Sequence, residues 1–329
     1  MIGERKMASG QNKYRLKVII LLSFLGLVRS HSMAQTDAFM SQYYEIPTLY
    51  NPAAAGSSGD LRFRGAGRLQ WTGTENNPRN FALTADMPLT VAGRGFGIGV
   101  RGGSQSEGPL RMMSAGMQVG YRFRLGGGSL TAALEGRYGN GRLKGSERKD
   151  NAFSIGAGLF YAHSSFWAGI SGLDLNSPVM SFVRRRPEET VDPESTEESD
   201  VTETENVEIK TKRTVCLMAG GNIPLSATLF ELLPSVIMKS DFDRLRGELT
   251  GRLRYKKLIS LGVGYRFDDA VVLTLAAEIK GFFIGYSYDC PVSSWSKKSD
   301  GSHEIVAGYS VKLDFRPKEK NKYKSIRIM

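Results

Sequence analysis

Residues 303–315 read HEIVAGYSVKLDF, and apolar and polar side chains alternate along most of this stretch. The apolar positions on one side are Ile305, Ala307, Tyr309, Val311, Leu313 and Phe315, and the polar positions on the other include Glu304, Ser310, Lys312 and Asp314. Successive residues of a β-strand point to opposite faces, so the pattern predicts a strand with one apolar and one polar face. About ten residues of such alternation suit one tilted crossing of a bilayer.

The same period of two recurs along the chain. Residues 113–125 set Met117 and Tyr121 against Gln118 and Arg122, and residues 245–255 repeat the pattern. The pattern predicts 14 strands, at 60–72, 79–87, 94–103, 110–124, 127–140, 152–162, 164–172, 211–221, 230–239, 245–254, 257–267, 270–278, 280–289 and 303–315. An even number of strands closes a barrel with both chain ends on one side of the membrane. We therefore predict an all-β fold, a transmembrane outer-membrane antiparallel β-barrel of about 14 strands, over residues 60–315.

A soluble β-sandwich is the alternative fold, because its strands alternate as well. The number and length of the strands and the lack of a second apolar face favour the barrel. After residue 28, every apolar run is shorter than the roughly 20 residues that a membrane helix needs. The tight connections at 126–128, 256–257 and 268–269 are expected to face the periplasm, where barrel turns are short.

The N-terminus resembles an export signal. Five Arg and Lys residues between Arg5 and Lys17 precede an apolar run from Val18 to Val28, and the small residues Ser32 and Ala34 follow. This order predicts a secretory signal peptide at 1–34, cleaved after Ala34. A membrane anchor is the alternative, although the 11-residue run is short for a bilayer. No cysteine lies near the cut, which argues against a lipoprotein.

Three segments outside the predicted strands differ in charge. Residues 35–59 are expected to form an N-terminal periplasmic segment. Residues 184–210 form a predicted acidic extracellular loop, in which 188–208 hold ten acids and no Arg or Lys; such a block stays solvated and disordered. A plain solvated insertion and a binding site are both compatible with it. Residues 316–329 form a basic C-terminal tail with six Arg or Lys and one acid.

The sequence has few residues suited to catalysis or metal binding. After Ala34 the chain has two histidines, His163 and His303, which lie too far apart in sequence to suggest a zinc site. Each has a serine beside it, but adjacent strand residues face opposite ways, so neither pair forms a nucleophile and its base. We predict no enzyme activity, no metal and no cofactor. Two cysteines, Cys216 and Cys290, do not make a disulfide framework.

Two further patterns have a structural interpretation. Gly95, Gly97 and Gly99 imitate part of a dinucleotide fingerprint, but no helix pattern or acidic partner follows them. Alternating glycines in a strand instead make room inside a lumen or between packed aromatic side chains. The net charge of +11 falls to about +6 when residues 1–34 are removed, and the arginines are spread singly along strands, which argues against nucleic-acid binding.

Charged side chains of both signs fall on the predicted inner face. They are Arg62, Arg64, Arg68, Arg122, Arg124, Arg137, Arg252, Arg254, Arg266, Glu135, Glu248, Glu278 and Asp268. Mixed signs allow ion pairs across a lumen, so a water-filled selective pore and a plugged barrel braced by ion pairs are both possible at this point.

Several short motifs resemble the PorP/SprF family of type IX secretion and gliding proteins. The motif residues are Ser41, Gln42, Tyr43, Asn51, Pro52, Gly56, Trp71, Gly108, Pro109, Arg111, Gly301, His303 and Glu304. They stand in the stretches FMSQY at 39–43, LYNPAAAG at 49–56, RLQWTG at 68–73, GPLR at 108–111 and GSHEI at 301–305. The matching stretches run over nearly the whole chain after residue 34.

The resemblance implies a non-enzymatic outer-membrane component of a type IX secretion or gliding machine, attached to periplasmic ring proteins or helping a surface adhesin leave the cell. The partners it implies are outer-membrane lipid, periplasmic secretion-machine proteins and a secreted adhesin, with no nucleic acid. A general porin or solute transporter, and a barrel enzyme acting on lipid, remain alternatives. From charge, we expect Lys318, Lys320, Lys322, Lys324 and Arg327 of the tail to contact an acidic periplasmic partner.

Overall fold

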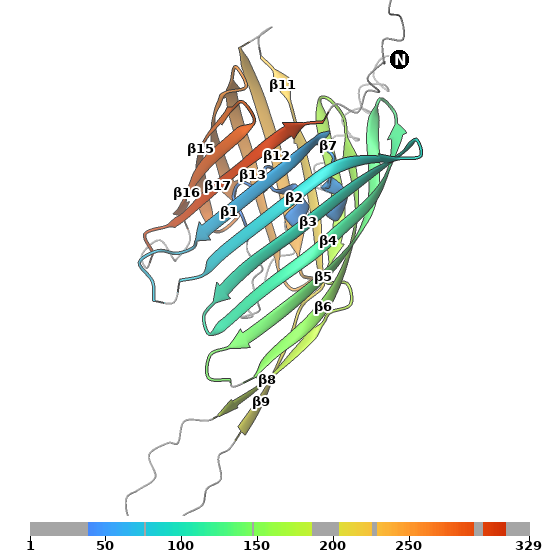
Figure 1. Ribbon diagram of the computed structural model, residues 1–329. Coiled ribbons are helices and arrows are strands. Elements are labelled where there is room, and N and C mark those ends of the chain that lie inside the picture. Colours follow the sequence, from blue (N-terminus) through green and yellow to red (C-terminus); the bar gives the residue numbers. More distant parts are fainter. Residues whose placement is uncertain are drawn as a thin grey trace, which may run out of the picture.

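The strands close into one antiparallel barrel (Figure 1). The computed structural model describes residues 39–75, 77–146, 148–185, 204–225, 229–292 and 299–313. Around the wall, β1 to β7 are followed by β10 and then by β12 to β17, and β17 pairs with β1. The wall therefore has the 14 predicted strands, and its closure rules out the sandwich. No helix in the described part of the chain is long and apolar enough to span a membrane.

The elements have the following bounds. The strands of the wall are β1 (Asp60–Leu69), β2 (Arg79–Val91), β3 (Arg94–Glu107), β4 (Leu110–Leu125), β5 (Gly128–Leu143), β6 (Lys149–Ala162), β7 (Phe166–Leu173), β10 (Thr214–Gly221), β12 (Phe230–Ser240), β13 (Leu245–Tyr255), β14 (Ile259–Arg266), β15 (Ala270–Ile279), β16 (Phe282–Pro291) and β17 (Ser302–Lys312). The remaining elements are β8 (Val179–Arg185), β9 (Thr204–Lys210), β11 (Ile223–Pro224) and the 3-10 turns η1 (Pro47–Leu49) and η2 (Pro52–Ala54).

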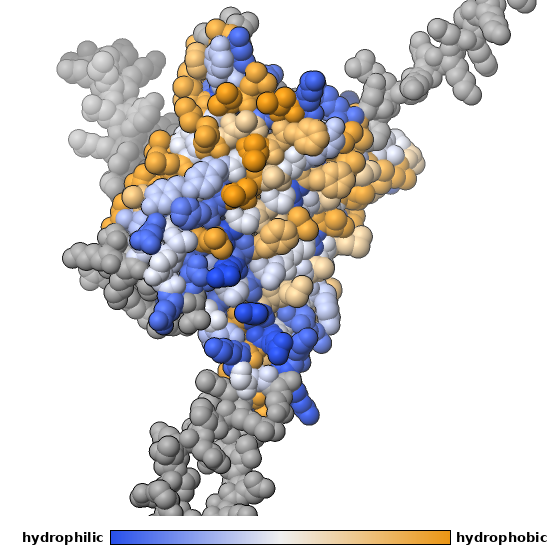
Figure 2. Space-filling view, turned by 60° about the vertical axis from the view of Figure 1, so that its left-hand side comes forward, coloured by the Kyte–Doolittle hydropathy of each residue, from blue (hydrophilic) through white to orange (hydrophobic). Residues whose placement is uncertain are grey.

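The two faces of the wall follow the predicted alternation. On β4 and β5, Met117 and Leu134 are exposed on the outer face, whereas their chain neighbours Gln118 and Glu135 are buried inside. In water such an apolar outer surface would be unfavourable, but in a bilayer it faces lipid. Figure 2 shows this apolar surface across the upper part of the molecule, with hydrophilic side chains gathered toward the end that carries β8 and β9.

The two ends of the barrel differ in their connections. At the end where β1 begins and β17 finishes, the β2–β3, β4–β5 and β15–β16 turns are two residues long. Both residues of each turn have positive φ, as in Ala92 and Gly93, which matches the twist of a tight hairpin. Most connections at the opposite end are longer. The short connection at 267–269 lies at that opposite end, so our expectation that it faces the same side as 126–128 was wrong.

A short hairpin interrupts the connection between β7 and β10. Its strands β8 and β9 pair with each other and project from the end with the longer connections (Figure 1). Met180 and Phe182 of β8 are buried against Leu110, Leu143 and Ala152 on the inner side of β4 to β6. The predicted loop over 184–210 therefore starts within β8 and finishes with β9, and the expectation of disorder over 188–208 does not hold at 204–208, where β9 forms and Val207 packs against this cluster. Residues 186–203 lie outside the described residues.

Residues 39–56 lie inside the barrel, where they pack against the inner wall. We expected residues 35–59 to form a periplasmic segment, and the structure corrects this expectation for 39–56. Phe39, Tyr43 and Tyr50 are buried in one cluster with wall residues such as Val306 and Ile237. We call residues 39–56 the plug.

Candidate functional site

The plug takes its shape from two proline-led turns. Pro47 begins η1 and Pro52 begins η2, positions at which the fixed φ of proline suits a helical turn and its missing N–H costs nothing. Asn51 caps η2, because its Oδ1 accepts a hydrogen bond from the Ala53 N–H at 2.9 Å. This compact backbone packs inside the lumen.

Buried charges on the wall bind the first part of the plug. The Glu304 carboxylate accepts hydrogen bonds from the backbone N–H groups of Ser41, at 2.7 Å, and Gln42, at 2.8 Å. Ser41 Oγ donates to Asp289 Oδ1 at 2.8 Å. Ionised acceptors make strong hydrogen bonds, and these are out of contact with solvent.

Two arginines complete this cluster. Arg68 donates to Asp289 at 2.6 Å and to Glu304 at 3.3 Å. Arg266 donates to Asp289 at 2.7 Å and to Glu248 at 2.8 Å. Both guanidinium groups also donate to Ser41 Oγ, at 2.9 Å and 2.7 Å. The cluster joins β1, β13, β14, β16 and β17 through one serine of the plug.

The remainder of the plug is held by hydrogen bonds on the other side of the lumen. Asn51 Nδ2 donates to the carbonyl oxygens of Leu159, at 2.9 Å, and Ile170, at 3.2 Å. Gln118 Nε2 donates to the Thr48 carbonyl at 2.7 Å, and the Gly56 N–H donates to Asp86 at 2.8 Å. The plug therefore contacts strands around the whole circumference.

Tyrosines of the plug reach a third part of the wall. Tyr43 Oη donates to Ser235 Oγ on β12 at 2.9 Å. Burial raises the pKa of the Tyr43 phenol well above its usual value, so the hydroxyl stays protonated and remains a donor. The guanidinium carbon of Arg252 lies 3.3 Å from the centre of the Tyr44 ring, and Arg252 also pairs with Glu45 at 3.4 Å.

Glycines on the wall leave room for the plug. A Cβ at Gly97 would lie 2.1 Å from the Ala55 carbonyl oxygen, and one at Gly285 would lie 2.1 Å from Gln42 Oε1. Atoms cannot approach so closely, so a side chain at Gly97 would displace the plug backbone, and one at Gly285 would move the end of the Gln42 side chain. The prediction that the alternating glycines at 95–99 make room inside a lumen is therefore confirmed at Gly97.

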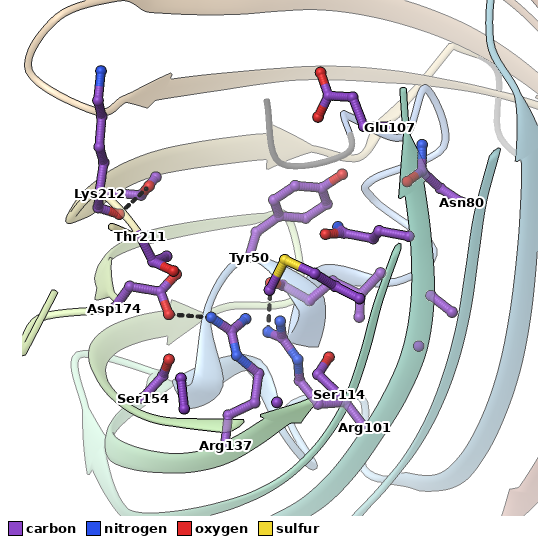
Figure 3. A pocket seen from close by; sticks show the side chains of 18 of the residues that line it. Tyr50, Asn80, Arg101, Glu107, Ser114, Arg137, Ser154, Asp174, Thr211 and Lys212 are labelled. Carbon is purple, nitrogen blue, oxygen red and sulfur yellow. Dashed lines mark hydrogen bonds and ion pairs between the residues drawn. The ribbon is translucent and has the colours of Figure 1, made fainter. Parts of the chain in front are cut away.

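Beyond the plug, toward the end with the longer connections, the lumen contains a cavity of about 150 Å³ (Figure 3). Leu49 and Tyr50 of the plug line it, together with Arg101 and the ion pair of Arg137 with Asp174. Arg101 Nη1 donates to the Leu49 carbonyl at 2.8 Å. A solute that entered from this end would meet the plug.

The structure brings some of the motif residues together and leaves the others apart. Ser41, Gln42, Tyr43, Asn51, Pro52, Gly56 and Glu304 come together in the lumen. Trp71 and Gly301 meet where the β1–β2 and β16–β17 connections touch, since the Trp71 N–H donates to Ser302 Oγ and the Thr72 N–H to the Gly301 carbonyl. Gly108 and Pro109 form the β3–β4 turn, Arg111 is exposed, and His303 Nδ1 lies 2.7 Å from Tyr286 Oη.

Other sequence expectations have mixed outcomes. Arg68, Arg266 and Glu248 point inward as predicted, whereas Arg124 and Asp268 are exposed near turns. Sequence reasoning did not connect Asp289 with the buried charges, although its alternation with Ser287 on β16 was a usable signal. The tail residues Lys318, Lys320, Lys322, Lys324 and Arg327 lie outside the described residues.

Groups suited to catalysis are scarce in the part of the chain that the structure describes. There, no cluster of three or more His, Cys, Asp or Glu is arranged to hold a metal ion. Cys216 is a buried free thiol and Cys290 an exposed one. The buried carboxylates of the lumen are engaged with arginines and plug backbone, so the site is organised to hold the plug.

A closed barrel with an apolar outer face and a polar, internally plugged lumen defines an outer-membrane β-barrel protein. Residues 32–309 match the family described as type IX secretion system membrane protein PorP/SprF. The chain belongs to that family, as the motifs indicated, and its location is the outer membrane.

Comparison with other proteins adds only distant likenesses. Among solved structures, a deltaS2 mutant of the TodX monoaromatic hydrocarbon channel is 9% identical, covers 82% of this chain and 94% of its own, and has a TM-score of 0.45. The NanC porin is 11% identical over 77% of this chain and 100% of its own, with a TM-score of 0.34. The Salmonella typhi outer membrane phospholipase is 9% identical over 77% and 90%, with a TM-score of 0.36. No curated protein matches the chain.

Proposed function

We propose that this protein is a closed, non-catalytic scaffold barrel of the type IX secretion apparatus, which attaches to periplasmic ring proteins or assists the export of surface proteins. Family membership supports the role in secretion. The observation that carries the scaffold role is the plug, which occupies the lumen and is held there by the buried cluster around Ser41.

The way the plug is held distinguishes a scaffold from a solute channel. A channel needs a continuous aqueous path with binding weak enough for solutes to leave. Here the carboxylates that could line such a path are paired with arginines and with plug backbone. Displacing the plug would take two backbone N–H donors away from the buried Glu304 carboxylate, and the loss of hydrogen bonds to a buried charge opposes that displacement.

The direction of attachment follows from the strand count. With 14 strands, the start of β1 and the finish of β17 lie at the same end, the one with most of the short turns. We assign this end to the periplasm, because periplasmic turns of such barrels are short. The basic tail then emerges on the side where ring proteins are found.

Deletion of the gene, with secreted cargo measured in the culture medium and on the cell surface, tests the proposal. We expect loss of secretion and its return when the intact gene is restored. The purified protein should retain periplasmic lipoproteins of the secretion machine. Normal secretion together with altered uptake of small solutes would instead assign the barrel as a porin.

A further inference from the structure

The outer face of β4, β5 and β6 carries a row of three cations near the end with the longer connections. Arg111 lies directly opposite Arg142, and Arg142 lies directly opposite Lys149. All three side chains are exposed. Their chain neighbours Leu110 and Leu143 are buried on the inner side, so the cations point outward.

This row is electrostatically unfavourable by itself. Like charges directly opposite one another on neighbouring strands destabilise a sheet. Within the described residues, no carboxylate forms an ion pair with Arg111, Arg142 or Lys149. An anion from outside the chain would remove the repulsion.

From the cations toward the middle of the wall, the type of exposed side chain changes from row to row. The next row along these strands holds Asn140 and Asn151, with Asn140 Nδ2 donating to Asn151 Oδ1 at 2.7 Å. Tyr138 and Phe153 follow in the row after that and are 54% and 55% exposed. Apolar residues such as Leu134 and Ile155 come next. Charge, amide, aromatic ring and apolar surface thus succeed one another toward the middle of the wall.

The spacing of the rows suits a lipid. Tyr138 lies four positions before Arg142 on β5. This separation is about 13 Å along the strand, and about 10 Å along the membrane normal for a strand tilted by about 40°. Aromatic side chains of barrels mark the boundary between headgroups and acyl chains. The cation row therefore lies at headgroup level, where phosphates are found, and the asparagines lie between phosphate and acyl chain.

We propose that this strip binds a phosphorylated glycolipid of the outer leaflet. Arg111, Arg142 and Lys149 contact its phosphates, Asn140 and Asn151 its sugar hydroxyls, and the aromatic and apolar rows its acyl chains. Guanidinium groups suit phosphate oxygens because they donate two parallel hydrogen bonds. The inference uses the outer-membrane location and the orientation with the longer connections outside, and it is independent of the role in secretion.

The test uses the purified full-length barrel in phosphatidylcholine vesicles, with and without lipid A that carries two phosphates. Heat-modifiable gel mobility reports the unfolding temperature. Lipid A should raise this temperature for the natural protein. The triple variant R111Q/R142Q/K149Q should lose the response and bind less lipid A by on the order of tenfold or more, since each basic side chain near an anionic lipid surface contributes on that scale.

A matched control removes three exposed cations from the opposite end, as R94Q/K256Q/K257Q, and should respond as the natural protein does. In pure phosphatidylcholine the first triple variant should be at least as stable as the natural protein, which shows that it folds. The inference is overturned if that variant retains the full lipid A response. It is also overturned if phosphatidylglycerol, or lipid A without phosphates, gives the natural protein the same shift.

Discussion

At Glu304 a single carboxylate holds both the wall and the plug. Its oxygens accept hydrogen bonds from the backbone of Ser41 and Gln42 and from Arg68. The family motif and the alternation of 303–315 identified Glu304 as an inward-facing motif residue, but its partners lie 236 to 263 positions away in the sequence. No local pattern connects residues at such separations.

Glu304→Gln should destabilise the barrel by about 3–5 kcal/mol. The change removes the negative charge that pairs with the buried Arg68, and it places the N–H donors of an amide against the backbone N–H donors of Ser41 and Gln42. Urea unfolding followed by gel mobility measures the cost. Glu231→Gln is the control, since its pair with Arg254 is partly exposed and should cost about 0–1 kcal/mol. Equal costs for the two variants would contradict the assigned role of the cluster.

A second prediction concerns depth on the lipid-facing side. Leu134 is 65% exposed, lies near the middle of β5, and should cost about 2–4 kcal/mol when replaced by Arg. Val311 shares the outward orientation but is the penultimate residue of β17, so Val311→Arg should cost only about 0–1 kcal/mol. The same unfolding assay compares them. A greater cost at Val311 would mean that the bilayer is centred elsewhere on the wall.

Among the elements, the plug differs most from its sequence-based interpretation. Its stretch 39–56 belongs to the segment 35–59 that we expected in the periplasm, and it shows neither the period of two nor a helical period. In the structure its apolar side chains and its backbone N–H groups are satisfied only by the inner wall. The wall therefore determines the conformation of the plug.

Removal of residues 39–56 should turn a non-conducting barrel into a conducting one. Planar bilayer recordings of the purified protein should show little steady current for the natural chain and long-lived openings for the deletion variant. The double variant Ser41→Ala and Asn51→Ala keeps the plug but removes side-chain contacts on two sides, and we expect brief openings from it. Equal steady conductance of natural and deleted proteins would show that the plug does not close the lumen.

For the whole molecule, the parity of the strands determines which parts share a side of the membrane. The connection between β7 and β10, with its β8–β9 hairpin, lies at the opposite end from the start of β1. The orientation proposed above places that connection outside the cell. This assignment is tested without reference to secretion.

A protease added to intact cells should cut within residues 188–208, because an acidic block without Arg or Lys stays accessible. The fragments on a denaturing gel locate the cut. Lysed cells serve as the comparison, and we expect intact and lysed cells to give the same cut. Cutting only after lysis would reverse the orientation of the barrel.

Truncation after Phe315 should leave barrel assembly unchanged and weaken binding to periplasmic ring proteins. β17 ends at Lys312, so the wall stays complete, while six basic residues are lost. Co-purification at low and high salt measures the effect, because binding driven by charge falls as salt rises. If the truncated protein binds the ring proteins as strongly as the full chain does at both salt concentrations, the tail is only a solvated end.

The sequence by itself determined the wall. The side-chain period of two and the turn residues are local properties, so residues such as Leu134, Glu135 and Glu304 could be assigned to a face and 14 strands could be counted. Only the tertiary structure decided what fills the lumen, which carboxylate meets which arginine, and that Met180 and Phe182 pack against β4 to β6. The physical reason is that these contacts join residues far apart in the chain, and their partners exist only after the barrel has closed.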